Sequence, residues 1–271
     1  MDLTLSINSA ENQFKQILED FFISAYNEKK LPSHGLEHHR RVWIIARELI
    51  TSLPEKQLPK DPHYISSLII ATYLHDIGMV TDPGPRHGRC SYDFCRIFLD
   101  QNDLQESDFP GLLNAILDHD KKDYSVPDVL NLQNLLSVAD DLDAFGFIGI
   151  YRYIEIYLLR DIKLKDLAES IRENAKKRYN HFEELFRFEK SLIKKHAERY
   201  RILDDFFRNY DLQFNRATGN HSYVKIVNLL NGIVKNSTSM DSLIRVHEKS
   251  RDKIISRFFL NLKSELSLTS A

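Results

Sequence analysis

The feature that most constrains the fold is an apolar helical segment, LIIATYLHDIGM, which contains an imidazole and a carboxylate near its end. Helical spacing aligns the apolar side chains of residues 64–79 on one face, and this face leads directly to His75 and Asp76. Burying an unpaired carboxylate costs several kcal/mol, and this face offers no Arg or Lys to compensate. A divalent metal that binds imidazole nitrogen and carboxylate oxygen together would compensate for that cost. The segment therefore predicts a buried helix that ends in metal ligands.

Helical periodicity dominates the rest of the chain. With 9 Gly and 8 Pro in 271 residues, the chain has too few turn-forming residues for an all-β sandwich or barrel. Apolar spacing predicts further helices at about residues 10–29, 36–53, 88–102, 111–118, 131–145, 151–160, 165–189, 190–212, 221–236 and 239–265. We therefore expect an all-α fold, with a core at residues 1–214 and a carboxy-terminal helical extension at residues 215–271. The extension is too apolar for an exposed helix, so we expect it to pack on a neighbour.

Charge and cysteine content narrow the class of protein. Lys plus Arg number 37 and Asp plus Glu number 39, so the net charge of −2 gives no global basic field for nucleic acid or a membrane surface. The sequence lacks an apolar run of about 18 residues and a recognisable signal peptide. Cys90 and Cys95 fit neither a disulfide framework nor a CxxC motif. We expect a cytoplasmic protein with no membrane partner and no specific nucleic-acid partner, and homo-oligomerisation is left open.

Two further regions place polar ligands on apolar faces. His38 lies on the apolar stripe of the helix at 36–53, and Asp140 follows the apolar run LLSVA, so both side chains are expected to point inward. The resulting set supplies two imidazoles and two carboxylates from three helices: His38, His75, Asp76 and Asp140. Such a set suits a catalytic metal with open positions for water and substrate. The sequence does not distinguish among Mn, Mg, Fe, Ni, Co and Zn.

The order His, His-Asp, Asp resembles that of the HD-domain superfamily of metal-dependent phosphohydrolases. Three elements carry the resemblance: HHRRV at residues 38–42, LHDIG around His75, and VADDLDAFGFIGIYR around Asp140. The third is similar to a segment of small bacterial HD hydrolases, some of which are nucleotide pyrophosphatases. A looser similarity around His181 extends the resemblance over about residues 12–214. The resemblance implies an HD-domain helical bundle that acts on a small phosphorylated substrate, with a nucleotide favoured.

The chain departs from the family pattern at two points. Met79 stands where many phosphodiesterase members carry the Lys of HDIGK. His87, His119 and Asp120 resemble the extra ligands of members with two metals, in which the second pair is usually His-His. With Asp120 read as the replacement for the second His, we expect one tightly held ion. A second ion, with Asp76 bridging, is expected to bind more weakly.

Basic residues beside these extra ligands are the candidates for substrate binding. Arg86, Arg89, Lys121 and Lys122 are expected to hold phosphate oxygens that the missing lysine would otherwise hold. The alternative is that these residues are solvent-exposed loop side chains with no role in substrate binding.

Other polar residues near the motifs have simpler interpretations. His39 is expected to face solvent, and His34 to cap the start of its helix. Asp143 either orients a metal ligand or forms a helix cap or salt bridge.

Together these residues predict a metal-dependent phosphohydrolase. The metal would bind a phosphate oxygen and lower the pKa of its water, and Asp76, His119 or Asp120 would take the proton of that water. Two alternatives stay open at this point. One is an HD-type oxygenase that uses two irons, and the other is a regulatory module that binds a nucleotide with little turnover.

Overall fold

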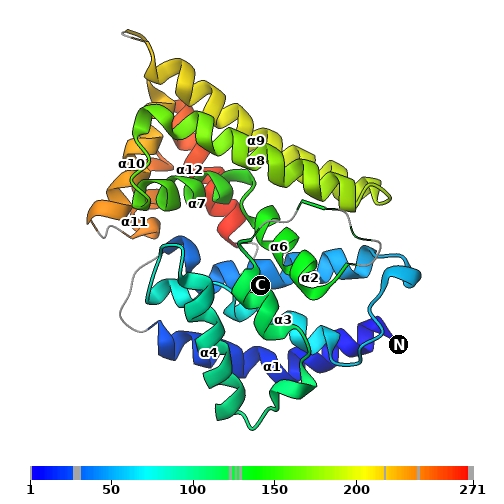
Figure 1. Ribbon diagram of the computed structural model, residues 1–271. Coiled ribbons are helices and arrows are strands. Elements are labelled where there is room, and N and C mark those ends of the chain that lie inside the picture. The colour runs from blue at the N-terminus through cyan, green and yellow to red at the C-terminus, as the bar shows by residue number, and fades with distance from the viewer. Residues whose placement is uncertain are drawn as a thin grey trace. The chain divides into compact units, whose positions relative to one another are not determined.

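The computed structural model describes residues 2–26, 32–121, 124–125, 127, 130–216, 218–236 and 239–267. Within these ranges the chain forms twelve α-helices and five short 3-10 helices, with no strand (Figure 1). The prediction of an all-α fold is confirmed. None of the described helices is both long enough and apolar enough to span a membrane.

The chain divides into two compact units, Met1–Leu142 and Asp143–Ala271. This division differs from the boundary predicted at residues 214–215, which falls inside the second unit between α9 (Lys190–Phe214) and α10 (Ser222–Asn236). The physical reason is packing, because α10 contacts both α9 and α7 (Gly146–Leu159). The carboxy-terminal helices therefore share a core with helices that precede residue 214.

The first unit is built around a buried helix. Its helices are α1 (Leu3–Ala25), α2 (Leu36–Ser52), α3 (Tyr64–Leu74), α4 (His87–Gln101), α5 (Leu112–Asp118) and α6 (Leu132–Asp143). Helix α3 packs on α1, α2 and α5, and all of its residues except Ser66 are buried. A helix that is apolar around its whole circumference belongs in the interior of a bundle. The predicted buried helix is therefore confirmed.

This buried helix ends earlier than its apolar pattern predicts. Helix α3 stops at Leu74, and Ile77–Val80 forms a short 3-10 helix. Gly78 lies so close to α4 that a methyl group there would overlap backbone atoms of His87 and Ser91. The Gly78 N–H also donates to Ser91 Oγ at 2.9 Å. The close approach of α4 requires glycine at position 78, and the break after Leu74 leaves Asp76 at the start of the 3-10 turn.

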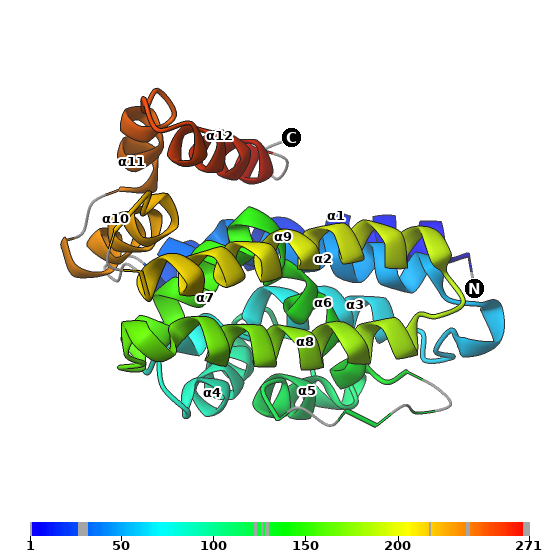
Figure 2. The same cartoon turned by 90° about the horizontal axis from the view of Figure 1, so that it is seen from above.

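The second unit is a helical bundle of its own. It contains α7, α8 (Leu167–Leu185), α9, α10, α11 (Met240–His247) and α12 (Lys253–Ser267). The two longest helices of the unit, α8 and α9, lie side by side (Figure 2). Helix α7 packs on α9, α10 and α12, and several side chains of α10 and α12 are fully buried: Ile226, Val227, Leu230, Phe259 and Leu262. The expectation that the carboxy-terminal segment packs on neighbouring helices is confirmed.

An ion pair is buried at the start of the second unit. Arg152 Nη1 lies 3.0 Å from Asp143 Oδ2, and both side chains are buried. Of the interpretations open for Asp143, the salt bridge is confirmed.

Candidate metal centre

Four ligand candidates converge in the first unit. His38 comes from α2, His75 and Asp76 follow α3, and Asp140 comes from α6. His38 Nε2 and His75 Nε2 are 3.4 Å apart, and each lies 3.4–3.8 Å from a carboxylate oxygen of Asp76 and of Asp140. All four residues are 5% exposed or less. The structure therefore brings together the whole set that the sequence predicted.

These separations fit a shared cation. Two ligand atoms about 2.1 Å from one ion lie about 3.0 Å apart at a right angle and about 3.4 Å apart at a tetrahedral angle. The observed separations lie at or slightly above the upper value, so a small contraction would bring the four atoms to bonding distance. Among the described residues the partners within ion-pair distance of Asp76 are imidazoles, and in the neutral form that binds a metal, imidazoles do not balance a buried carboxylate charge. These buried His and Asp side chains could hold a metal ion.

Local hydrogen bonds fix the tautomer of three rings in the cluster. In each ring Nδ1 contacts the carbonyl oxygen three residues earlier: His75 with Thr72 at 3.0 Å, His87 with Gly84 at 2.7 Å and His119 with Ile116 at 2.7 Å. A carbonyl oxygen only accepts, so each Nδ1–H donates, and Nε2 of the neutral ring keeps its lone pair. This arrangement is typical of metal-ligating histidines.

A second set of candidate ligands gathers around the other oxygen of Asp76. Asp76 Oδ1 lies 3.0 Å from His119 Nε2 and 3.5 Å from His87 Nε2, and those two nitrogens are 3.3 Å apart. Asp76 Oδ2 faces His38 and His75 instead. One carboxylate therefore faces two histidine pairs, one with each oxygen. Such sharing is what a bridging ligand between two ions requires.

Asp120 adds to the second set without replacing a histidine. His87 and His119 form the His-His pair by themselves, which corrects the premise that Asp120 stands in for its second member. Asp120 Oδ2 lies 3.1 Å from His87 Nε2, and the Asp120 side chain is 42% exposed. It is therefore the solvent-accessible member of the cluster, whereas His87 and His119 are buried.

Burial and charge together set the protonation of these groups. Burial raises the pKa of Asp76, but the neighbouring imidazoles, His75 first, outweigh it and hold that pKa well below its usual value. Burial lowers the pKa of His75, but Asp76 and Asp140 more than offset it and the pKa is raised. Burial likewise opposes protonation of His87, whose pKa is raised to about 9 by Asp120 and Asp76. Metal binding at these nitrogens therefore requires the release of protons.

No protein-family model, curated protein or solved structure matches this chain. The resemblance to the HD-domain superfamily therefore rests on the motif residues alone, and membership stays a prediction. The convergence of the His and Asp side chains is independent of it, because it is a property of the structure.

The residues predicted to bind substrate lie outside the buried cluster. Arg86, Arg89 and Lys121 are 61–83% exposed, and each pairs with a nearby carboxylate. The distances are 2.7 Å from Arg86 Nε to Asp82, 3.3 Å from Arg89 Nη2 to Asp93 and 2.7 Å from Lys121 Nζ to Asp118. A phosphate group would have to displace these partners. The role of the three residues stays a prediction, and Lys122 lies outside the described residues.

Two histidines belong to the surroundings of the site against expectation. His39 is fully buried, and its Nδ1 lies 3.1 Å from Thr72 O, so the interpretation that it faces solvent is wrong. His34 is also buried, with Nδ1 2.7 Å from Ser33 Oγ and Nε2 3.9 Å from Asp76 Oδ2. His34 ends the 3-10 helix Pro32–His34, and its ring centroid lies 5.3 Å from that of His38. The N-cap of α2 is Gly35, so the expectation that His34 caps this helix is wrong.

Proposed function

We propose that this chain is a divalent-metal-dependent hydrolase of phosphate esters or anhydrides, with a nucleotide as the favoured substrate class. The observation that carries the proposal is the Asp76 carboxylate, which presents one oxygen to His38 and His75 and the other to His87 and His119. The HD-like order of the motifs supplies the reaction class, as an analogy between families.

The donor set favours a transition metal. Imidazole nitrogen suits Fe, Ni and Zn, whereas Mg prefers oxygen ligands and retains several waters. Mg is therefore the poorest fit among the ions left open by the sequence. Within the proposal His38, His75 and Asp140 would hold one ion and His87 and His119 a second, with Asp76 shared. Bound ions would supply a water of lowered pKa and neutralise charge on the phosphoryl group.

Asp120 is the proton acceptor in this proposal. Nδ1 of His119 donates to Ile116 O and its Nε2 faces Asp76, so a metal-bound His119 has no nitrogen free to take a proton. Both oxygens of Asp76 also face ligand nitrogens. Asp120 combines contact with the cluster and access to solvent, which a proton acceptor for an attacking water needs. Asp120 is therefore preferred over Asp76 and His119, the other two candidates from the sequence.

The test combines metal content with product release. Protein purified without chelators should carry about two transition-metal ions per chain by mass spectrometry, and it should release phosphate or pyrophosphate from members of a nucleotide panel. His75→Ala and Asp140→Ala should lose metal and activity while keeping helical circular dichroism. If metal-loaded protein releases no phosphate from any phosphorylated substrate, the hydrolase is rejected.

An oxygenase with two irons is the second candidate. The same observation favours it, because a carboxylate shared by two histidine pairs also suits a pair of irons. Oxygen uptake that requires iron, without phosphate release, would identify it. Tight nucleotide binding without turnover would instead identify the regulatory module.

A further inference from the structure

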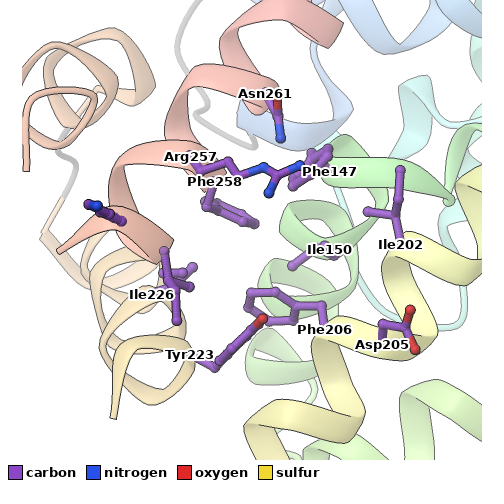
Figure 3. Close-up of a pocket in the computed structure, with 12 residues that line it drawn as sticks. Phe147, Ile150, Ile202, Asp205, Phe206, Tyr223, Ile226, Arg257, Phe258 and Asn261 are labelled. Atoms are coloured by element: carbon purple, nitrogen blue, oxygen red, sulfur yellow. The ribbon is translucent and has the colours of Figure 1, made fainter. Parts of the chain in front are cut away.

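We propose that the second unit holds a binding site for a small amphipathic carboxylate, of the kind represented by a medium-chain fatty acid. The site is a pocket of about 460 Å³ among α7, α9, α10 and α12 (Figure 3). Its volume lies within the range of small-molecule sites, roughly 300–1,000 Å³. All of its lining residues belong to the second unit, and none belongs to the metal cluster. The inference therefore does not depend on the proposed function.

Aromatic and branched side chains form the apolar part of the pocket. Phe206 lies at the centre of this surface, with its ring centroid 5.2 Å from that of Tyr223 and 5.4 Å from that of Phe258. The ring of Phe147 packs edge to face on Phe258 at 5.6 Å. Phe147, Tyr223 and Ile202 remain partly exposed. A ligand with an apolar body would remove this concave surface from water, which favours binding.

A polar stripe of α12 lines the pocket beside the apolar surface. Lys253, Arg257 and Asn261 follow one another at intervals of four residues, so they share one helical face. Within the described ranges neither cation makes an ion pair. Figure 3 shows the Arg257 side chain reaching across the pocket toward Phe147. An anion would relieve the repulsion between the two cations and form charge-assisted hydrogen bonds with both.

Charge balance and the scarcity of other polar groups favour a monoanion with an apolar body. Asp205 is the one carboxylate among the described lining residues, and it lies 3.4 Å from Arg208 Nη1. Arg208 is shared with Asp204, to which it lies closer at 2.6 Å, but Lys253 and Arg257 outnumber the one lining carboxylate and leave the pocket with a net positive charge. Only the Tyr223 hydroxyl and the Asn261 amide remain to bond further polar groups. A nucleotide would leave its base edge and sugar hydroxyls unpaired there, at a cost in affinity.

The experiment is calorimetric titration of the full chain with decanoate. Decanol and decyltrimethylammonium serve as ligands with the same tail and a neutral or a positive head group. Decanoate should bind at one site per chain and more tightly than either. Arg257→Gln and Lys253→Gln should each weaken decanoate roughly threefold to tenfold and leave decanol unchanged. Arg251→Gln removes an exposed charge outside the pocket and should have no effect.

Four results would each overturn the proposal. Decanol binding as tightly as decanoate would show that the cations take no part. Full decanoate affinity in the Arg257→Gln, Lys253→Gln double variant would put the site elsewhere. Tighter binding of adenosine monophosphate that is lost in the double variant would make this a nucleotide site. A dimer in sedimentation that binds no decanoate, and that Arg257→Glu converts to monomer, would make a second copy of the chain the occupant.

Discussion

At the scale of single residues, Asp76 is the side chain on which the candidate metal centre depends. Its two oxygens face different histidine pairs, so it is the one ligand that both sets have in common. Asp120 differs in place and in proposed role, because it contacts His87 of the second set and is open to solvent. Substitution of these two aspartates should therefore separate metal binding from proton transfer.

Asp76→Asn should weaken the binding of both ions and lose one of them, because asparagine carries no negative charge and offers one oxygen where the carboxylate offers two. Asp120→Asn should keep the ions but lower kcat by roughly 10²–10⁴-fold, the usual contribution of a general base. Metal analysis and a phosphate-release assay check the two effects. Wild-type turnover in Asp120→Asn would remove Asp120 from the mechanism, and retention of both ions in Asp76→Asn would exclude the bridging role.

Glu19 provides a test of pH dependence away from the metal cluster. Arg40 Nε donates to Glu19 Oε1 at 3.0 Å, and the Tyr73 hydroxyl donates to the same oxygen at 3.0 Å. Burial raises the pKa of Glu19, but these hydrogen bonds outweigh it and the pKa is lowered in the folded protein. A carboxyl group with a lowered pKa stabilises the fold above its unfolded pKa of 4.5, and this contribution is lost as the pH falls through the folded value.

Glu19→Gln should therefore lower the free energy of unfolding at pH 7 by about 1–2 kcal/mol, and the difference from wild type should shrink toward about pH 3. Urea titrations at the two pH values measure it. Glu37→Gln is the matched control, because Glu37 also pairs with Arg40 but is 46% exposed, and its effect should stay within about 0.5 kcal/mol. A Glu19→Gln deficit that grows on acidification would reverse the sign and contradict the argument.

The sequence identified the buried His and Asp side chains that interrupt apolar runs, and it missed His39, whose burial depends on a second neighbour. His38, His75 and Asp140 each lie on a single apolar stripe, so periodicity alone predicts that they point inward. His39 is one position off the stripe of α2. It is buried because α1 covers that side, with the Phe22 and His39 ring centroids 4.5 Å apart. The spacing of apolar residues along α2 does not predict that a second helix, α1, covers the side on which His39 lies.

At the scale of elements, the sequence predicted the helices better than their ends. The helix expected over residues 239–265 is two helices, α11 and α12, because Asp252 begins a new one. Its Oδ1 accepts from the backbone N–H of Ile254 at 3.0 Å and of Ile255 at 3.3 Å. An aspartate that caps a helix start and one on an exposed helical face have similar sequence surroundings. The close contact of Gly78 with α4, in the 3-10 turn that follows α3, is a long-range contact that helical periodicity does not predict either.

Gly78→Ala should destabilise the fold by about 2–3 kcal/mol, because the added methyl group overlaps backbone atoms that cannot move without shifting α4. The shift would also carry His87 away from Asp76, so the affinity for a second ion should fall. Gly232→Ala is the control, since an added methyl group meets no atom there and should raise stability by about 0.5–1 kcal/mol. Urea denaturation and metal titration distinguish the two variants. Equal stability of both would show that α4 accommodates the methyl group.

At the scale of the whole molecule, each of the two candidate sites belongs to a different compact unit. The candidate metal ligands all lie within Met1–Leu142, and the apolar pocket lies within Asp143–Ala271. The boundary predicted from the motifs lies at residues 214–215, later in the chain than the observed division after Leu142. Motif residues indicate where chemistry occurs, and they do not indicate which helices share a hydrophobic core. Helices α10 and α12 complete the core of α7 and α9, and this packing follows from long-range contacts that no motif records.

A cut after Gly219 should therefore cause aggregation or a change of oligomeric state, because it uncovers the apolar faces of α7 and α9. The metal ligands stay in the truncated chain. Size-exclusion chromatography with light scattering measures the outcome, and a cut after Ser267, which leaves every described helix intact, is the control. A truncated chain that stays soluble with unchanged mass would show that α7 and α9 do not need this cover.

The carbonyl three residues before each of His75, His87 and His119 holds the ring within its own turn of backbone. A rigid-body displacement of α4 or α5 therefore carries its imidazole along without rotating it. In the proposed two-metal site, substitutions in the surrounding core would then change the spacing between the ions while Nε2 stays the ligating nitrogen. Because the spacing between two ions determines which phosphate groups both ions contact, core substitutions would change the substrate selectivity of the proposed hydrolase without altering any candidate ligand.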